Sequence, residues 1–383
     1  MNNILHSLSH LSGQLALVCY LCCLCTSGFS QVPGVSYDIS FFGGRIIKHT
    51  PNLKFDVPPI SGGVELALRW QKYGKKEWHE RQGYPTSGIA LSYFDFGDGE
   101  KLGRAYSASA MLELYFVQRA TWDFYFQPAV GVGFLDRSYD INTNPEGNAV
   151  GSLINSAVSF RFGAHFDLSK AFRMHAGATF SHWSNGGSAL PNFGINLPAL
   201  QVGLEYTPAR VLPQDFLHFD LSRKPLHRWG MNAWAGFTKK EMLVPDGPSF
   251  PLYMTSVAVT YELSNANTLS AGTEYELDMS VYRFGQHIYL YETEEAAWLG
   301  ASRFMVFLGD EFHFGHSSIL VQAGTYLGDN AFLVPWKYYT KLAYRYYFKE
   351  KGKPGVRPYI GIYMKSHRIT AEYFALGGGV SIR

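Results

Sequence analysis

A histidine and a serine stand two residues apart in the segment FSHWSNGGSALPNFGIN, which begins at Phe180. A neutral imidazole can take the proton of a hydroxyl, and the oxygen can then attack an acyl carbon. Glycines after such a pair free the backbone to aim N–H groups at a developing oxyanion, and an asparagine amide can assist. This chemistry makes His182 a candidate base and Ser184 a candidate nucleophile. The candidate oxyanion or positioning residues are Asn185, Gly186 and Asn192.

The same segment also suits a polar hairpin loop. Asn, Gly, Pro and Ser are the residue types that turns favour, and all four occur here. The choice between a loop and a catalytic site depends on the direction of the two side chains and on the medium around them. Both follow from the elements that flank the segment.

The N-terminal segment predicts export from the cytoplasm. Residues 1–30 carry no charge and contain the apolar run LALVCYLCCLC, with small residues before Gln31, so we expect a secretory signal peptide cleaved near Ser30. A lipoprotein anchor is disfavoured because no small residue precedes any of its cysteines. All the cysteines of the chain lie here, which excludes disulfides, thiol catalysis and Cys-ligated metals from the mature protein. They are Cys19, Cys22, Cys23 and Cys25.

The composition favours a transmembrane β-barrel. The 33 basic and 31 acidic residues nearly cancel, which argues against a nucleic-acid partner. After the signal segment, no run reaches the roughly eighteen apolar residues that a membrane helix needs. Yet 16% of the residues are aromatic and only 17% are charged. Amphipathic rings and few charges are typical of outer-membrane barrels.

Strict alternation supports this fold class. Across 122–134 the even positions are apolar, as at Phe124 and Val132, and the odd positions are polar or small, as at Asp123 and Gln127. The pattern recurs across 154–168 and 269–279. A period of two predicts strands, and runs of about ten residues match tilted strands that cross a bilayer. Closure is then required, because an open edge in hydrocarbon leaves backbone groups unpaired.

About sixteen such segments are expected, eight before Pro208 and eight after Phe216. The pattern predicts an all-β, antiparallel transmembrane barrel, and leaves open one large barrel or two eight-stranded units. The expected organisation is a signal peptide at residues 1–30, a barrel half with the His-x-Ser-Asn motif at 31–207, and a second strand-rich half at 208–383.

Carrying the alternation along 172–184 gives the direction of the candidate pair. Even positions are apolar up to Phe180, so His182 and Ser184 continue the outward, lipid-facing row, and Asn196 points outward from the next strand. Side chains at i and i+2 on one strand face lie about 7 Å apart, so the imidazole can reach the hydroxyl. Counting strands from a periplasmic N-terminus places the pair near the outer surface. Phe180 and Trp183 are candidates to hold acyl chains.

The motif resembles a known family. His182-Trp-Ser184-Asn185-Gly, followed by Pro-Asn192-x-Gly-Ile, is similar to the active-site segment of the outer-membrane lipid A 3-O-deacylases, the PagL family of eight-stranded barrels. The resemblance implies Ser184 as nucleophile, His182 as base, and Asn185 and Asn192 as oxyanion or positioning residues. Asn196 stands where the family carries a glutamate to orient the histidine. An asparagine can hold an imidazole but supplies no charge to stabilise the imidazolium.

We therefore expect a serine-type esterase of the cell outer membrane that removes an ester-linked acyl chain from lipid A or a related outer-leaflet lipid. The expected partners are that lipid and the membrane, without nucleic acid, metal or cofactor; nothing indicates the oligomeric state. The histidines of HFGH, His313 and His316, would point to opposite faces of a strand and do not predict a metal site. The alternative function is a noncatalytic barrel, either a structural protein or a channel through one wide ring.

Overall fold

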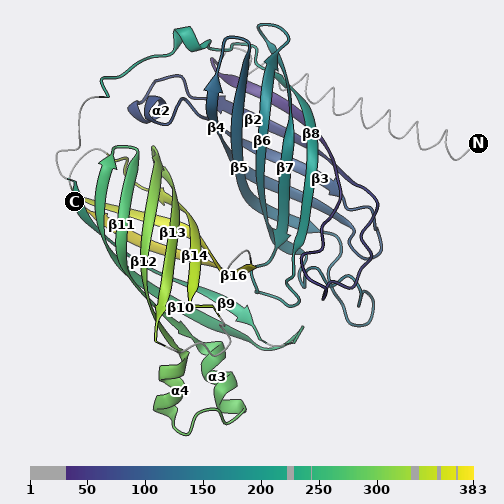
Figure 1. The fold of residues 1–383 in the computed structure, drawn as a ribbon, viewed down its shortest axis with the longest axis vertical. Helices are drawn as coiled ribbons and strands as arrows, with labels where there is room; N and C mark the ends of the chain where they lie inside the picture. Colours follow the sequence, from purple (N-terminus) through teal and green to yellow (C-terminus); the bar gives the residue numbers. More distant parts are fainter. Residues whose placement is uncertain (1–31, 222–227, 243, 329–335, 352–354, 368–369) are drawn as a thin grey trace, which may run out of the picture.

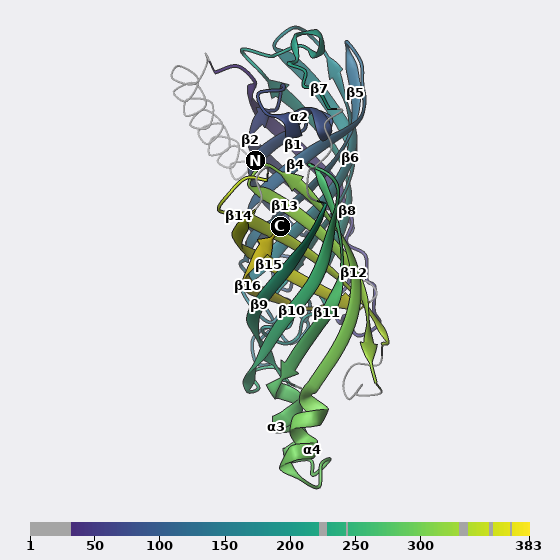
Figure 2. The ribbon, with the colours of Figure 1, turned by 90° about the vertical axis from the view of Figure 1, so that its left-hand side faces the viewer.

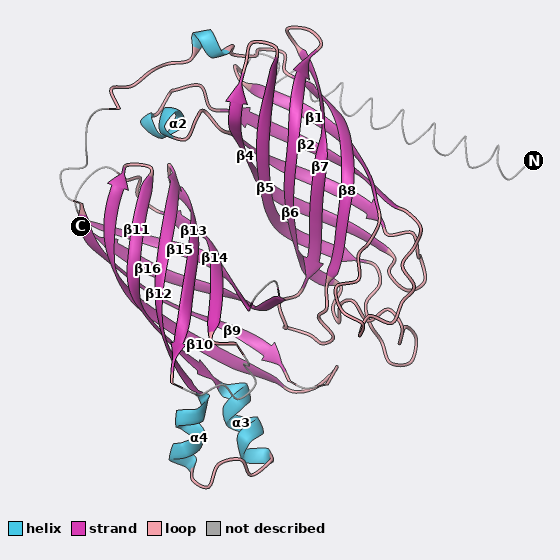
Figure 3. Ribbon diagram, in the orientation of Figure 1, coloured by secondary structure: helices cyan, strands magenta, loops and turns pink. Residues whose placement is uncertain are grey.

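The computed structural model describes residues 32–221, 228–242, 244–328, 336–351, 355–367 and 370–383. The predicted signal peptide at residues 1–30 lies outside these described residues. Strands dominate the described chain and form two closed antiparallel barrels (Figure 3). The structure therefore has two eight-stranded units, one of the two arrangements that the alternation allows.

The first barrel follows from the alternation. In its fifth strand, Phe124 and Val132 are exposed on the outside while Tyr125 and Gln127 are buried inside. Each strand thus presents an apolar row outward and a polar or small row inward, as expected in a membrane. Its strands are β1 (Val35–Gly44), β2 (Ser61–Gln71), β3 (Thr86–Asp95), β4 (Arg104–Gln118), β5 (Trp122–Leu135), β6 (Ile154–Asp167), β7 (Phe172–Ser184) and β8 (Ile195–Tyr206).

Closure of the first barrel rests on β1. Tyr37 pairs with Leu68 of β2 on one side and with Tyr206 of β8 on the other, both antiparallel. All other neighbours are consecutive in the chain. The first and last strands of the unit therefore lie side by side, and no edge is left open.

The second barrel closes in the same way through β9. Trp234 pairs with Ser256 of β10 and with Gly379 of β16. Its strands are β9 (Trp229–Glu241), β10 (Ser249–Ser264), β11 (Asn267–Asp278), β12 (Ser302–Phe314), β13 (Ser317–Leu327), β14 (Tyr338–Tyr347), β15 (Val356–His367) and β16 (Thr370–Ile382).

Two short helices, α3 (Met279–His287) and α4 (Glu294–Ala301), join β11 to β12 and extend from one end of the second barrel (Figures 1 and 2). The alternation predicted that the strand continues to Met279, but it ends at Asp278, whose carboxylate accepts a hydrogen bond from the Ser280 N–H and caps α3. Thr293 caps α4 in the same way. In the part of the chain that the structure describes, none of the helices is long and apolar enough to cross a membrane.

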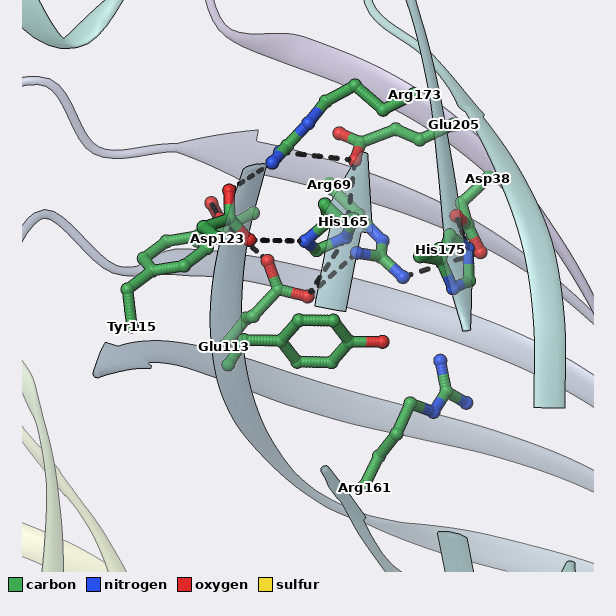
Figure 4. Close-up of polar contacts among 12 residues, drawn as sticks. Asp38, Arg69, Glu113, Tyr115, Asp123, Arg161, His165, Arg173, His175 and Glu205 are labelled. Carbon is green, nitrogen blue, oxygen red and sulfur yellow. Dashed lines mark hydrogen bonds and ion pairs between the residues drawn. The ribbon is translucent and has the colours of Figure 1, made fainter. Parts of the chain in front are cut away.

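Charged side chains occupy the interior of the first barrel (Figure 4). Arg69 contacts Glu113 at 2.9 Å, and both are buried. Two histidine–aspartate pairs lie nearby, His175 with Asp38 at 2.7 Å and His165 with Asp123 at 2.8 Å. Inward side chains just fill a barrel of eight strands. This packing disfavours a channel through a wide lumen.

The two barrels meet near both ends. At one end, α2 (Glu77–Arg81), between β2 and β3, lies against turns of the second barrel: the Trp78 and Phe314 rings are 6.2 Å apart, and Gln82 donates to the Ala266 carbonyl at 3.2 Å. At the other end, the β7–β8 loop contacts the ends of β9 and β16. The linker between the barrels, with η1 (Pro213–Asp215), runs beside the α2 end (Figure 1).

Candidate active site

The candidate site begins with a direct pair across β7 and β8. His182 and Asn196 are register partners in the antiparallel ladder, which puts their side chains on one face. Nδ1 of His182 lies 2.6 Å from Oδ1 of Asn196. An amide oxygen only accepts, so this contact calls for a proton on Nδ1 and leaves Nε2 with a lone pair.

A residue that the sequence analysis missed completes this line of side chains. Nδ1 of His49 lies 2.8 Å from Nδ2 of Asn196. The chain after β1 continues along β8, where the Ile47 N–H donates to the Asn196 carbonyl at 3.0 Å. The sequence contained a signal for the direction of His49. The outward-facing residues of β1 have odd numbers, and the same alternation, continued beyond the end of β1, predicts that His49 also points outward. Using it required knowing that β1 lies beside β8.

Ser184 lies on the same strand face as His182 but is covered. Its side chain is only 2% exposed, and its Oγ makes no hydrogen bond to any described residue. The Ser184 carbonyl accepts a hydrogen bond from Ser156 Oγ at 2.8 Å. Ser184 therefore lies on the outward face of β7, as the alternation predicted, but its hydroxyl is covered by other residues. Catalytic hydrogen bonds are often long or poorly aligned before substrate binds.

Asn185 organises the loop that follows Ser184. Its Oδ1 accepts from the Gly187 N–H at 3.0 Å, and its Nδ2 donates to Ser152 Oγ at 3.0 Å. Its own backbone N–H donates to Oδ1 of Asn192 at 2.9 Å. The Asn185 amide is therefore engaged within the protein, which fits a positioning role better than direct contact with an oxyanion.

The glycines of this loop are required by its backbone. Gly186 and Gly187 have φ of +62° and +78°, values that other residues adopt at a cost. A Cβ on Gly186 would also lie 2.3 Å from Cδ2 of Phe374 in β16. The second barrel therefore packs directly against the candidate site, a contact for which alternation along the strands contains no signal.

Gly194 shapes the surroundings of the imidazole. Its φ is +80°, and a Cβ there would lie 2.5 Å from Cε1 of His182. Its N–H donates to the Ala149 carbonyl at 2.8 Å, which ties this turn to the β5–β6 loop. A side chain at position 194 would displace the ring from Asn196.

Trp183 points away from the expected acyl chains. It is 2% exposed, its ring packs against Phe94 and Phe96, and its Nε1 donates to Ser107 Oγ at 3.0 Å. The expectation that it holds lipid is wrong, because an odd position on β7 faces the interior. Phe180 does point outward and is 36% exposed.

The HFGH histidines are separated. His313 is buried in the second barrel, 3.1 Å from Thr268 Oγ1, whereas Nδ1 of His316 contacts the Tyr347 carbonyl at 2.8 Å. Among the residues that the structure describes, no group of three or more His, Cys, Asp or Glu side chains could hold a metal ion.

Comparisons with known proteins match both halves of the chain. The family model described as lipid A 3-O-deacylase (PagL) matches residues 62–205, and that described as acyloxyacyl hydrolase, C-terminal domain, matches residues 227–383. None of the curated proteins matches the chain.

Three similar solved structures are the following. The outer membrane enzyme PagL is 19% identical with a TM-score of 0.33, and covers 43% of this chain and 97% of its own. Neisserial surface protein A is 7% identical with a TM-score of 0.32, and covers 45% and 97%. The attachment invasion locus protein Ail of Yersinia pestis is 14% identical with a TM-score of 0.28, and covers 46% and 99%.

Proposed function

The chain belongs to the PagL family of outer-membrane β-barrels, and from this premise we propose that it hydrolyses an ester-linked acyl chain of lipid A or a related outer-leaflet lipid. The family description supports the reaction class. The residues of the β7–β8 end support the chemistry, and the observation that carries it is the 2.6 Å contact between His182 Nδ1 and Asn196 Oδ1.

In the proposed acylation step, Oγ of Ser184 attacks the ester carbonyl carbon while Nε2 of His182 takes its proton. The tetrahedral intermediate collapses, the bond to the lipid oxygen breaks, and His182 returns the proton to that oxygen. The lipid leaves with a free hydroxyl, and the acyl chain stays on Ser184. A water molecule, deprotonated by His182, then attacks the acyl-serine. The bond between the acyl carbon and Ser184 Oγ breaks, His182 returns the proton to Oγ, and the fatty acid is released. Protein groups, water and the ester suffice for this cycle.

The Asn196 contact supports His182 as the base because it holds the tautomer whose Nε2 can accept a proton. The Gly186 N–H and the Asn192 amide are the proposed oxyanion donors, with Asn185 holding the loop that presents them. Because Ser184 is buried, we infer that the lipid displaces part of this loop when it binds.

A noncatalytic barrel is the competing function. Two observations favour it: Asn196 cannot supply the negative charge that stabilises an imidazolium, and Ser184 Oγ is not bonded to His182. In the first barrel this alternative means a structural protein, because charged side chains occupy the interior.

Mass spectrometry of lipid A from Gram-negative cells that express the full chain tests the proposal. We expect a species that lacks one acyl chain with the parent protein, and unmodified lipid A with Ser184→Ala. Ser181→Ala is the matched control, since Ser181 is on the same strand but points inward, and it should behave as the parent. Unmodified lipid A in cells whose outer membrane contains the heat-modifiable, folded parent barrel would favour the noncatalytic function.

A further inference from the structure

Three side chains from separate segments form a line at the candidate site. His182 on β7 contacts Asn196 on β8, and Asn196 contacts His49 in the segment after β1. A primary amide has one accepting and one donating end. The orientation of the Asn196 amide therefore determines what it offers to both histidines at once.

A neutral His49 supports the productive orientation. When neutral His49 carries its proton on Nε2, its Nδ1 lone pair accepts from Nδ2 of Asn196, and Oδ1 then faces the other way, toward Nδ1 of His182. That oxygen holds the proton of His182 on Nδ1 and leaves Nε2 free to accept. A glutamate at position 196 would not depend on His49 in this way, because both of its oxygens accept.

Protonation of His49 reverses this preference. Imidazolium donates from both nitrogens and has no lone pair to accept the Asn196 N–H. The amide is then stable when turned over, with Oδ1 toward His49 and Nδ2 toward His182. Nδ1 of His182 must now accept, its proton moves to Nε2, and Nε2 can no longer take the proton of Ser184.

We propose that His49 is a positioning residue that sets the Asn196 amide and so makes the base function of His182 depend on the protonation state of His49. The catalytic part of this inference rests on the proposed esterase function. The effect of His49 on the tautomer of His182 is independent of that function.

The surroundings of His49 suit such a role. His49 is exposed to the medium. The facing titratable group on β7 is His182; β8 has no charged residue before Glu205, and residues 185–194 have none. The charged neighbours of His49 along its own segment are Arg45 and Lys48. Nζ of Lys48 lies 5.3 Å from the centre of the Phe55 ring. These named neighbours are cationic or neutral, and none of them is a carboxylate that could form an ion pair with His49.

The first test is the pH profile of kcat/KM for the full-length protein. Both His49 and His182 must be neutral, so log kcat/KM of the parent should fall with a slope approaching two at acid pH. His49→Gln offers a neutral acceptor at every pH and should retain activity with a slope of one. His49→Lys is a permanent donor and should lose about tenfold or more at every pH, since a wrong tautomer costs up to about ten-thousandfold in a serine protease.

Thr50→Lys is the matched control, because it adds the same charge one position away and should keep the parent profile. In Asn196→Glu, the identity of residue 49 should no longer affect the slope. A His49→Gln variant with the parent slope, or a His49→Lys variant as active as Thr50→Lys, would overturn the proposal.

The second test does not require turnover. In a Ser184→Ala background, nitrogen chemical shifts of labelled His182 should report the Nδ1–H tautomer with His49→Gln and the Nε2–H tautomer with His49→Lys. If this change occurs but the parent hydrolyses no lipid, the positioning role stands and the esterase function fails. If Ser184-dependent hydrolysis is found and the His182 tautomer is the same in both variants, the esterase stands and the role of His49 is wrong.

Discussion

The carboxylate of Glu241 in the second barrel accepts a hydrogen bond from the backbone N–H of Leu190, in the loop that follows Ser184. The backbone N–H of Glu241 also donates to the Gly187 carbonyl at 3.1 Å. Glu241, at the end of β9, therefore holds two backbone groups of the loop: its carboxylate accepts from the Leu190 N–H, and its backbone N–H donates to the Gly187 carbonyl. The second barrel is in this way a structural part of the candidate site, although its own strands contribute none of the proposed reacting groups.

Removing the Glu241 carboxylate should lower the rate of deacylation without unfolding either barrel. Glu241→Ala leaves the Leu190 N–H without this acceptor, and a hydrogen bond worth about 1 kcal/mol corresponds to about fivefold in activity. The measurement is the rate of deacylation per folded barrel, with folding judged by heat-modifiable mobility on gels. Glu241→Gln keeps an acceptor and should lose less. Equal losses in both variants would mean that the charge, rather than the hydrogen bond, is what matters.

Substituting Gly186 should lower activity as well as stability, because the added side chain meets a steric clash in addition to the strain of a positive φ. Gly186→Ala forces an alanine to a φ of +62° and places its Cβ against Phe374. Gly83→Ala is the control, because Gly83 has a φ of +69° and nothing within 4 Å of the added Cβ. Both should pay the left-handed strain of about 1–2 kcal/mol, but only Gly186→Ala should also lose activity. Adding Phe374→Ala should restore part of that activity; no recovery would mean that this contact does not shape the loop.

The fold class could be predicted from the sequence because alternation is a local property. Each strand of a barrel needs an apolar row toward lipid, and this row is visible in β5 and β11 without any knowledge of their partners. The number of rings could not be predicted in this way. One ring of sixteen strands and two rings of eight have the same alternation, and they differ only in whether β8 pairs with β1 or with β9.

The part of the site that follows from alternation within strands could also be predicted from the sequence. The parity along β7 and β8 puts His182 and Asn196 on one face, where the structure brings them into contact. His49 could not be added, because it reaches Asn196 only when β1 closes on β8. Gly186 against Phe374 is a contact between barrels, and no periodicity within one strand encodes it.

The proposed base and nucleophile should behave as a unit. If Ser184 attacks and His182 takes its proton, either group alone is of little use, and removing one removes the function of the other. Ser184→Ala, His182→Ala and the double variant should each lose activity by a similar factor, on the order of a thousandfold. Initial rates on a purified ester-linked lipid measure this. Losses that multiply in the double variant would show that the two residues act independently.

The docking of α2 should depend on pH. Burial, followed by the positive charges of Lys72 and Lys76, lowers the pKa of His79 to about 4, and its Nδ1 accepts from the Gly74 N–H at 3.3 Å. An undocked His79 has an ordinary pKa of about 6.5, so the undocked form takes up a proton first as the pH falls. Docking should therefore be unaffected above about pH 6.5, weaken between about 6.5 and 4, and change no further below that range.

Hydrogen exchange at residues 77–82 measures the docking of α2. His79→Gln cannot be protonated and provides the reference at each pH, which removes the intrinsic pH dependence of exchange. We expect faster exchange in the parent than in His79→Gln at pH 5 and equal exchange at pH 7.5. Faster exchange in the parent at both pH values would point to a packing effect of the substitution instead of a titration.

The last prediction concerns Asn196, the residue in contact with the proposed base His182. Asn196→Leu is similar in size but cannot accept the His182 N–H, so the ring loses its preferred tautomer and turnover should fall by about tenfold or more. Asn196→Glu keeps an acceptor and adds a negative charge that stabilises the imidazolium formed during attack, so turnover should be kept or raised. A charge near hydrocarbon costs folding free energy, and the yield of the Glu variant should drop. Rates are therefore compared per folded, heat-modifiable barrel. If Asn196→Leu hydrolyses lipid as fast as the parent while Ser184→Ala does not, the 2.6 Å contact in the free protein is not the one that orients His182 during catalysis.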